Sequence, residues 1–246
     1  MKKSLLFLFL FSLLFMVVSC KKDKTTTTVD PPYVPVTPVL STSLAGLGYH
    51  GGIPSGTAWT FPANIQVVGN IVGGDPGKSP YIGKKTIEAW ENYSQNSAKT
   101  NWVTHGLGEF VSLYMNLHNT SASPSTFIFP AGLLFCNRCC GDTITDTTQT
   151  GLVVVPDTVT IPGGDTLRLC LKSFCSNPNR HAPTYLSVYD PAVVSNNDQV
   201  VHFIEALHVK SVLVLAGHES DILSYIWKFV GGTPLTTADY AVIAAW

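Results

Sequence analysis

The chain has 246 residues, of which 45% are hydrophobic and 13% are charged, and its formal net charge is −1 at pH 7. This length fits one folded domain with flanking segments. Because the charge is sparse and no basic patch stands out, the composition excludes the electrostatic attraction on which nucleic-acid binding depends, and we expect no nucleic-acid partner.

The N-terminus carries the pattern of an export signal. Lys2 and Lys3 precede an apolar run over residues 5–18, and Ser19 then leads to Cys20. The run is shorter than the roughly twenty residues that a membrane-spanning helix needs. The pattern resembles the lipoprotein signal of bacterial surface proteins of the Bacteroidota type. The resemblance implies that residues 1–19 form a signal peptide, that Cys20 receives acyl chains such as palmitate, and that the protein is anchored by this lipid in the outer membrane, periplasmic or surface-exposed.

Residues 20–43 form the next segment, which is rich in threonine and proline. Four threonines at 25–28 are followed by Pro31, Pro32, Pro35 and Pro38. The prolines favour extended backbone, and the segment cannot bury enough apolar surface to fold. We therefore predict a lipid-anchored tether, which at about 3.1 Å per residue can hold a domain several tens of ångströms off the membrane.

Residues 44–190 have the pattern of an all-β domain. Over 111–119 the apolar residues Val111, Leu113, Met115 and Leu117 alternate with polar ones, which predicts a half-buried strand with His118 facing solvent. A helix is predicted over 84–96. Turn-separated extended segments are predicted over 59–61, 65–72, 126–129, 133–135, 152–155, 158–161 and 167–174. The spacing of the turns predicts a β-sandwich, immunoglobulin-like or related.

Residues 191–246 have a helical pattern instead. After the capping residues Asn196, Asn197 and Asp198, apolar residues recur with helical spacing at Val200, Ile204 and Leu207. A second helix is predicted through 222–229, ended by Gly231 and Gly232, and a third from Thr236 to the end of the chain. Strand signals followed by helix signals predict a mainly β domain with a C-terminal helical cap.

Several short motifs carry a family resemblance. They are the segments 129–135, 149–152 and 174–177, then Arg180 and Pro183, and the pair Ile226-Trp227. Together they resemble secreted bacterial β-domains and, distantly, the thioester domains of surface adhesins, which have Thr-Gln-x-x-Ile-Trp with the glutamine bonded to an upstream cysteine. Leu223 stands at the place of that glutamine, so we expect no thioester.

Five cysteines remain beside the lipidation site. They are Cys136, Cys139, Cys140, Cys170 and Cys175, for which two disulfides and one free thiol suit an exported protein. The alternatives are buried free thiols and a zinc site made of Cys136-x-x-Cys139 with Cys170 and Cys175. Strand parity sends Cys170 and Cys175 to opposite faces, which argues against zinc. The pairing stays open, because the adjacent Cys139 and Cys140 can compete for one partner.

Motifs of catalysis are incomplete. Residues 74–79 imitate a phosphate-binding loop, but Val72 stands where its first glycine belongs, and His50-Gly51-Gly52 has no accompanying G-x-S-x-G nucleophile elbow. On a helix, His202 and His208 lie about 120° apart, so they do not share a metal, whereas His202 and Glu205 can make a surface contact. We therefore predict no catalytic residue, no metal ion and no cofactor.

Four Asp-Thr pairs, which begin at residues 142, 146, 157 and 165, resemble O-glycosylation sites of Bacteroidota, although such pairs also start turns and strands.

A tether in front of a domain of low charge favours a binding function. We predict a non-catalytic module of the cell envelope that is held to the membrane by lipid and binds a surface glycan or a protein. The alternative is an extracytoplasmic hydrolase whose acidic residues are scattered in the sequence.

Overall fold

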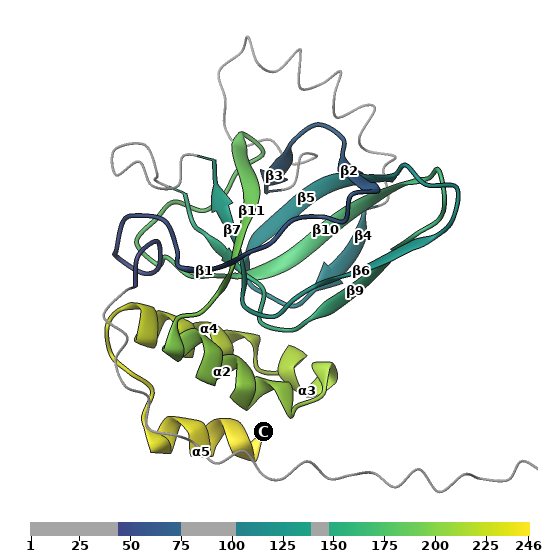
Figure 1. Cartoon of the computed structure of the whole chain (residues 1–246). Helices are drawn as coiled ribbons and strands as arrows, with labels where there is room; N and C mark the ends of the chain where they lie inside the picture. Colours follow the sequence, from purple (N-terminus) through teal and green to yellow (C-terminus); the bar gives the residue numbers. More distant parts are fainter. Residues whose placement is uncertain (1–43, 75–101, 139–147) are drawn as a thin grey trace, which may run out of the picture. The chain divides into compact units, whose positions relative to one another are not determined.

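Two long strands with alternating side chains form the centre of the protein in a computed structural model that describes residues 44–74, 102–138 and 148–246 (Figure 1). In β5 (Phe110–Asn119), the predicted residues Val111, Leu113, Met115 and Leu117 are buried. Every residue of β5 except the last, Asn119, pairs with β10 (Thr166–Cys175), from Thr166 opposite His118 to Phe174 opposite Phe110. The predicted alternation over 111–119 is therefore confirmed. The signal peptide, Cys20, the tether, the helix predicted over 84–96, and Cys139 and Cys140 lie outside the described residues.

Within the described residues, six strands close into a barrel. From β5 the order runs through β3 (Ile71–Gly73), β11 (Ser187–Ser195), β7 (Leu133–Asn137) and β8 (Gly151–Leu152) to β10, which pairs with β5 again. Three further strands pair with strands of the barrel: β1 (Gly56–Ala58) with β11, β2 (Ile65–Val67) with β5, and β4 (Val103–Gly106) with β10. A separate pair, β6 (Ser125–Phe129) and β9 (Asp157–Ile161), forms a second small sheet.

The mainly β prediction is confirmed, but the core is a closed barrel rather than the predicted sandwich. Alternation along a strand reports which face is buried, and this pattern is the same in a sandwich and in a small barrel. The pairing of β5 with β10 closes the barrel, and the paired residues of these two strands lie 48 to 64 positions apart along the chain. A local sequence pattern does not predict which distant strands pair.

Other strands differ from the predictions in their bounds. The segment 65–72 divides into β2 and β3 around Gly69, which has φ 82°. The structure adds β1, β4 and β11, which the pattern did not predict, whereas residues 59–61, predicted as extended, follow β1 and belong to no strand. In β11, Pro191 lies in the middle of the strand and its register against β7 shifts between Pro191 and Val194. A proline inside an apolar run normally argues against a strand, and the bulge is what accommodates it here.

The four helices described follow β11: α2 (Asp198–His208), α3 (Val212–Ala216), α4 (Glu219–Val230) and α5 (Thr237–Ala245). Asn197 caps α2, since its side chain accepts hydrogen bonds from the backbone N–H groups of Gln199 and Val200. The predicted helices near 200–207, 222–229 and 236–246 are thus confirmed, while the short α3 was not predicted. Buried side chains of the helices and of the barrel form one hydrophobic cluster, with Phe203, Ile226 and Phe229 among the helical members.

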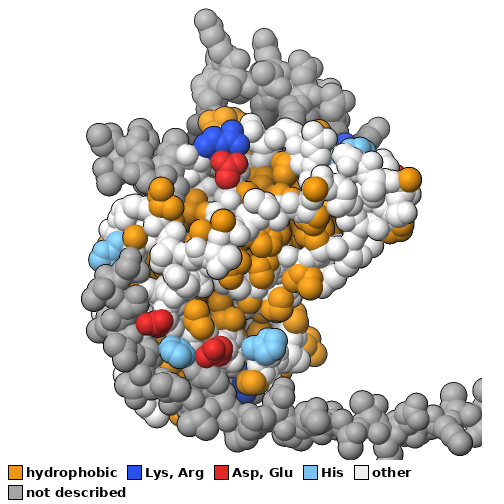
Figure 2. All heavy atoms as spheres, in the orientation of Figure 1, with side chains coloured by type: hydrophobic (Ala, Val, Ile, Leu, Met, Phe, Trp, Pro, Cys, Tyr) orange, Lys and Arg blue, Asp and Glu red, His pale blue; other side chains and the backbone are white. Residues whose placement is uncertain are grey.

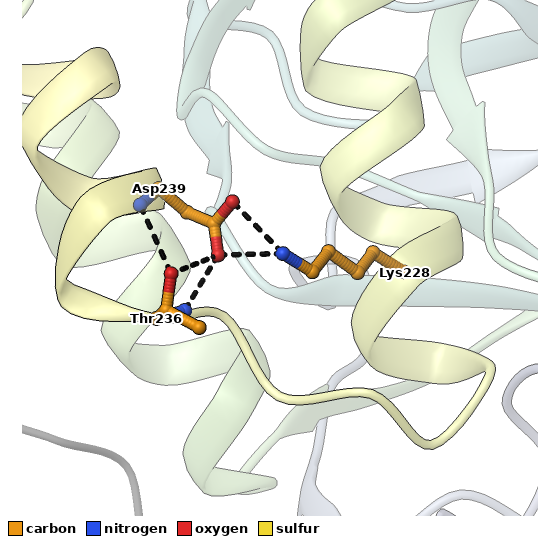
Figure 3. Close-up of polar contacts among 3 residues, drawn as sticks. All are labelled: Lys228, Thr236 and Asp239. Carbon is orange, nitrogen blue, oxygen red and sulfur yellow. Dashed lines mark hydrogen bonds and ion pairs between the residues drawn. The ribbon is translucent and has the colours of Figure 1, made fainter.

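A three-residue polar contact fastens α5 to α4 (Figure 3). Thr236 and Asp239 form a capping box, in which the Thr236 hydroxyl accepts the N–H of Asp239 and the Asp239 carboxylate accepts the N–H of Thr236 at 2.6 Å. The ammonium of Lys228, on α4, donates to both carboxylate oxygens of Asp239, at 2.7 and 2.9 Å. One carboxylate therefore caps α5 and pairs with Lys228 of α4 at the same time.

None of the helices in the described ranges has the length and apolar character that crossing a bilayer requires.

Candidate functional site

Three aromatic side chains from different parts of the chain lie together at α4. Tyr49 and Phe110 are 65% and 57% exposed, and Trp227 is half-buried. The ring centroids of Phe110 and Trp227 are 5.9 Å apart. A β-carbon on Gly231 would lie 3.8 Å from Cε2 of Tyr49, which places Tyr49 at the C-terminal end of α4, about one turn beyond Trp227. We call Tyr49, Phe110 and Trp227 the aromatic ledge.

Polar residues continue the surface toward the start of α4. Ser220 and Ser224 are exposed, and their spacing puts them on the same helix face as Trp227. The Ser220 hydroxyl donates to a carboxylate oxygen of Glu109 at 3.4 Å, and the N–H of Gly108 donates to Glu219 at 3.2 Å. These bonds tie α4 to the turn that precedes Phe110, and they bring two carboxylates next to the ledge.

The backbone of Phe110 is strained. Its φ is 73°, and it is the one non-glycine residue with positive φ among those that the structure describes. Such a conformation costs on the order of 1 to 3 kcal/mol for a bulky side chain. Because the ring is more than half exposed, burial in the core does not offset this cost. Strain of this kind is concentrated at binding and catalytic sites, so it marks Phe110 as a candidate.

A partly buried hydrogen bond holds the Trp227 side chain in place. Its indole N–H donates to the backbone carbonyl oxygen of Cys175 at 3.1 Å. Cys175 is the last residue of β10, and it faces Gly151 of β8 in the sheet. The bond therefore fixes the indole of α4 against the end of the barrel strand.

Asn177 holds the segment that carries Tyr49. Its side chain is fully buried, and its Nδ2 donates to the carbonyl oxygens of Gly46 and Gly48, at 3.3 and 3.0 Å. Its Oδ1 accepts the N–H of Thr150 at 3.0 Å. A β-carbon at Gly48, which has φ 58°, would lie 1.9 Å from the carbonyl oxygen of Val230. Only glycine permits this approach of the chain to the end of α4.

The motifs behind the family resemblance meet at this place. Segment 174–177 touches segment 149–152 through Cys175 and Asn177, and Trp227 of the Ile-Trp pair binds Cys175. Leu223, at the place of the thioester glutamine, is buried in the core.

The sequence analysis did not identify Phe110 or Tyr49 as candidate site residues. The available signal was the position of Phe110, since in the alternation of 111–119 it falls on the solvent-facing parity with Ser112 and Tyr114.

The described cysteines are buried, and the environment of Cys175 disfavours its thiolate. Cys175 is fully buried and forms no disulfide. Burial raises the pKa of the Cys175 thiol, against the smaller opposing effects of the Asn177 N–H, Trp227 and Arg180, so the thiolate is suppressed. Cys136 and Cys170 are buried and are not joined to each other or to Cys175. The predicted disulfides stay a prediction, because Cys139 and Cys140 lie outside the described residues.

The geometry of β10 argues against a zinc site that uses both Cys170 and Cys175. Its pairing with β5 has no register shift, so Cys170 and Cys175 point to opposite faces of the sheet. Over the described ranges, no three His, Cys, Asp or Glu side chains gather closely enough to hold a metal ion.

The histidines make pairwise contacts. Nδ1 of His105, on β4, lies 2.8 Å from the carboxylate of Asp157, the first residue of β9, and both side chains are about four-fifths buried. Within the described residues, this is the one side-chain hydrogen bond of His105. The predicted contact of His202 with Glu205 is confirmed, at 3.2 Å. The N–H of His50 donates to the carbonyl oxygen of Leu47 at 3.0 Å and closes a turn just before Gly51 and Gly52.

The predicted Asp-Thr pairs are only partly described. Asp157 begins β9 and contacts His105, and Asp165 directly precedes β10, so both described pairs start strands. The pairs at 142 and 146 lie outside the described residues.

Comparisons of this chain with protein-family models, with curated proteins and with solved structures found no match.

Proposed function

We propose that this protein is a non-catalytic lipoprotein of the outer membrane whose barrel domain binds a surface glycan or a protein through the aromatic ledge. The observation that carries the proposal is the exposed ring of Phe110, held at φ 73° beside Trp227. A conformation that costs stability and exposes an aromatic ring is retained where the ring serves binding.

The ledge has the physical properties of a binding hot spot. Tyrosine, tryptophan and phenylalanine offer large flat areas that release free energy when a partner covers them. The indole bond to Cys175 orders the Trp227 side chain before binding, and the Asn177 bonds to Gly46 and Gly48 order the backbone next to Tyr49. Less conformational entropy is then lost on association, which strengthens binding.

The surface around the barrel suits neutral or mixed partners. On the face drawn in Figure 2, hydrophobic side chains gather over the barrel and toward the helices, and charged side chains are few. Without residues 1–19 the chain keeps 13 basic and 16 acidic residues, because 15 − 2 lysines is 13, so its net charge is −3. Such a chain is not drawn to polyanions.

The membrane anchor is supported by the N-terminal sequence. Lys2, Lys3, the apolar run and Cys20 match a lipoprotein signal, and residues 20–43 supply a tether between the lipid and the domain. An acyl-anchored domain on an extended tether reaches ligands outside the membrane plane. Mass spectrometry of the protein from its native membrane tests this part. We expect an acylated Cys20 at the N-terminus, and an intact Met1 or a non-acylated Cys20 would refute the anchor.

The binding function is tested with the full chain on an array of glycans and envelope proteins. We compare it with Phe110→Ala and with a matched control, Leu213→Ala, which truncates a hydrophobic side chain that is 85% exposed on α3. Selective binding should persist in the control and fall about tenfold or more in Phe110→Ala. Equal binding by all three chains would refute the ledge as the site. No selective binding, together with hydrolysis of a test substrate, would favour the hydrolase.

A further inference from the structure

We infer that the aromatic ledge is covered, in the ligand-free chain, by the chain's own proline segment, residues 33–38. The sequence of this segment is Tyr-Val-Pro-Val-Thr-Pro, so that Pro35 and Pro38 form a P-x-x-P motif. The inference rests on the proposed function, because it takes the ledge as the binding surface and names what covers it. An outside ligand then has to displace the segment, which lowers its apparent affinity by the fraction of chains whose ledge is open.

Residues 44–48 hold the chain next to the ledge. Leu44 and Leu47 are 7% and 2% exposed, and the N–H of Gly48 donates to the carbonyl oxygen of Ser176 at 2.7 Å. These contacts fix the backbone directly before Tyr49, at the C-terminal end of α4. The proline segment, which lies outside the described residues, is therefore joined to the domain within a few residues of the ledge.

The link between the proline segment and Leu44 is long enough for the segment to fold back. The six residue steps from Pro38 to Leu44 extend to about 19 Å at about 3.1 Å per residue. This reach exceeds the length of the ledge, since the ring centroids of Phe110 and Trp227 are 5.9 Å apart and Tyr49 lies about one helical turn beyond Trp227. The two prolines of a P-x-x-P motif are about 9 Å apart in a polyproline II helix, which matches this length.

The chemistry of the ledge suits a proline motif. Surfaces lined with aromatic rings bind P-x-x-P segments, because proline rings pack on the flat faces and the polyproline II backbone loses little entropy. This backbone has no internal hydrogen bonds, so its carbonyl oxygens remain acceptors. The exposed hydroxyl of Tyr49 has no hydrogen-bond partner among the described residues and can donate to one of them.

The charges around the ledge favour an uncharged segment. Residues 33–43 contain no charged side chain. The nearby acidic residues Glu109 and Glu219 are offset by the basic residues Lys172 and Arg180. Because neither sign of charge dominates there, the electrostatic field does not select a cationic or an anionic partner. Aromatic packing and backbone hydrogen bonds then decide what binds.

The first experiment follows the indole ¹H–¹⁵N cross peak of Trp227 in the full chain. Pro35→Ala/Pro38→Ala removes the motif and keeps the length of the tether, and the matched control, Pro31→Ala/Pro32→Ala, removes two prolines outside the segment. Far-UV circular dichroism confirms that each variant is folded. The Trp227 peak should move in Pro35→Ala/Pro38→Ala and keep its wild-type position in the control. An unchanged peak in Pro35→Ala/Pro38→Ala, or the same shift in both variants, overturns the inference.

The second experiment adds a synthetic peptide of residues 33–39 to these chains. In Pro35→Ala/Pro38→Ala the peptide should return the Trp227 peak toward its wild-type position, and Phe110→Leu in the same chain should weaken the peptide about two- to fivefold. The wild-type chain should need about tenfold more peptide, because its own segment competes at high effective concentration. Equal titrations of the wild-type chain and the variant overturn the inference.

Two further outcomes separate this inference from its alternatives. A wild-type Trp227 peak that moves on dilution would show that the segment binds a second copy, which contradicts a contact within one chain. If the array finds no ligand while Pro35→Ala/Pro38→Ala still moves the Trp227 peak, the proposed function is refuted and the covered ledge stands.

Discussion

The indole N–H of Trp227 donates to the carbonyl oxygen of Cys175 over 3.1 Å. This bond joins α4 to the last residue of β10, which pairs with β5 along almost its whole length. Phe110 starts β5, and its ring meets the same indole. The Trp227 side chain thus contacts both the barrel and the exposed ring of Phe110. The aromatic ledge therefore depends on the folding of both α4 and the barrel.

Phe110 gives a prediction about backbone strain. At φ 73°, glycine is less strained than alanine, so Phe110→Gly should be more stable than Phe110→Ala by about 1 kcal/mol, although glycine usually destabilises a strand. Urea unfolding of both variants measures the difference. At Ile128, an exposed residue of β6 with ordinary φ, the same pair of substitutions should have the opposite order. The same order at both positions would contradict the strain.

Asn177 gives a prediction about the loop that carries Tyr49. Asn177→Asp replaces the donor that binds Gly46 and Gly48 with an oxygen, which leaves two carbonyls facing a carboxylate. We expect a loss of about 3 kcal/mol in the free energy of unfolding, since buried polar groups lose their partners. The neighbouring exposed Asn179 provides the control, because Asn179→Asp should change stability by less than about 0.5 kcal/mol. Similar losses at both positions would show that the buried network contributes little.

How far the sequence predicted this fold can be argued from single elements. The alternation of Val111 to Leu117, the Asn197 cap and the Thr236–Asp239 box all report local geometry, and all are present in the structure. The barrel could not be predicted in the same way, because its closure depends on which strands pair across the chain. The strand β11 was hidden by Pro191, whose bulge is visible only in the sheet.

The candidate site was predictable in part. The motifs 149–152, 174–177 and 226–227 were noted in the sequence, and the structure places Cys175 and Asn177 beneath the ledge. The exposed members Tyr49 and Phe110 were missed, because surface aromatics have no periodic signature. Their proximity to Trp227 arises from the tertiary contacts of α4.

Asp239 gives a prediction about pH. Burial alone would raise its pKa, but hydrogen bonds from Lys228 and Thr236 and the charge of Lys228 outweigh this and hold the pKa below its ordinary value. The carboxylate therefore stabilises the fold above its unfolded pKa of about 4, and this contribution is lost as pH falls through the lower folded pKa. Asp239→Asn should cost about 1 to 2 kcal/mol at neutral pH and progressively less in acid.

Thermal unfolding across pH measures the contribution of Asp239. Asp198→Asn, which changes an exposed carboxylate in the first turn of α2, serves as the control and should shift stability only slightly. Parallel stability curves for the wild-type chain and Asp239→Asn over the whole acid range would contradict the assignment.

Cys175 gives a prediction about reactivity. Because its thiol is fully buried and its pKa is raised, iodoacetamide should modify it only after unfolding. Peptide mapping by mass spectrometry, before and after denaturation and without reduction, measures this and also reveals any disulfide among the remaining cysteines. Rapid modification of Cys175 in the folded chain would contradict the buried environment.

The central claim is most directly tested by nuclear magnetic resonance of the tryptophan indoles. The ¹H–¹⁵N cross peaks of the full chain are assigned by single Trp→Phe variants and followed as a ligand selected on the array is added. The account predicts that the Trp227 peak shifts with the ligand, while that of Trp246, which stacks on His218, stays in place. A ligand that shifts Trp246 or Trp59 and leaves Trp227 unchanged would contradict it.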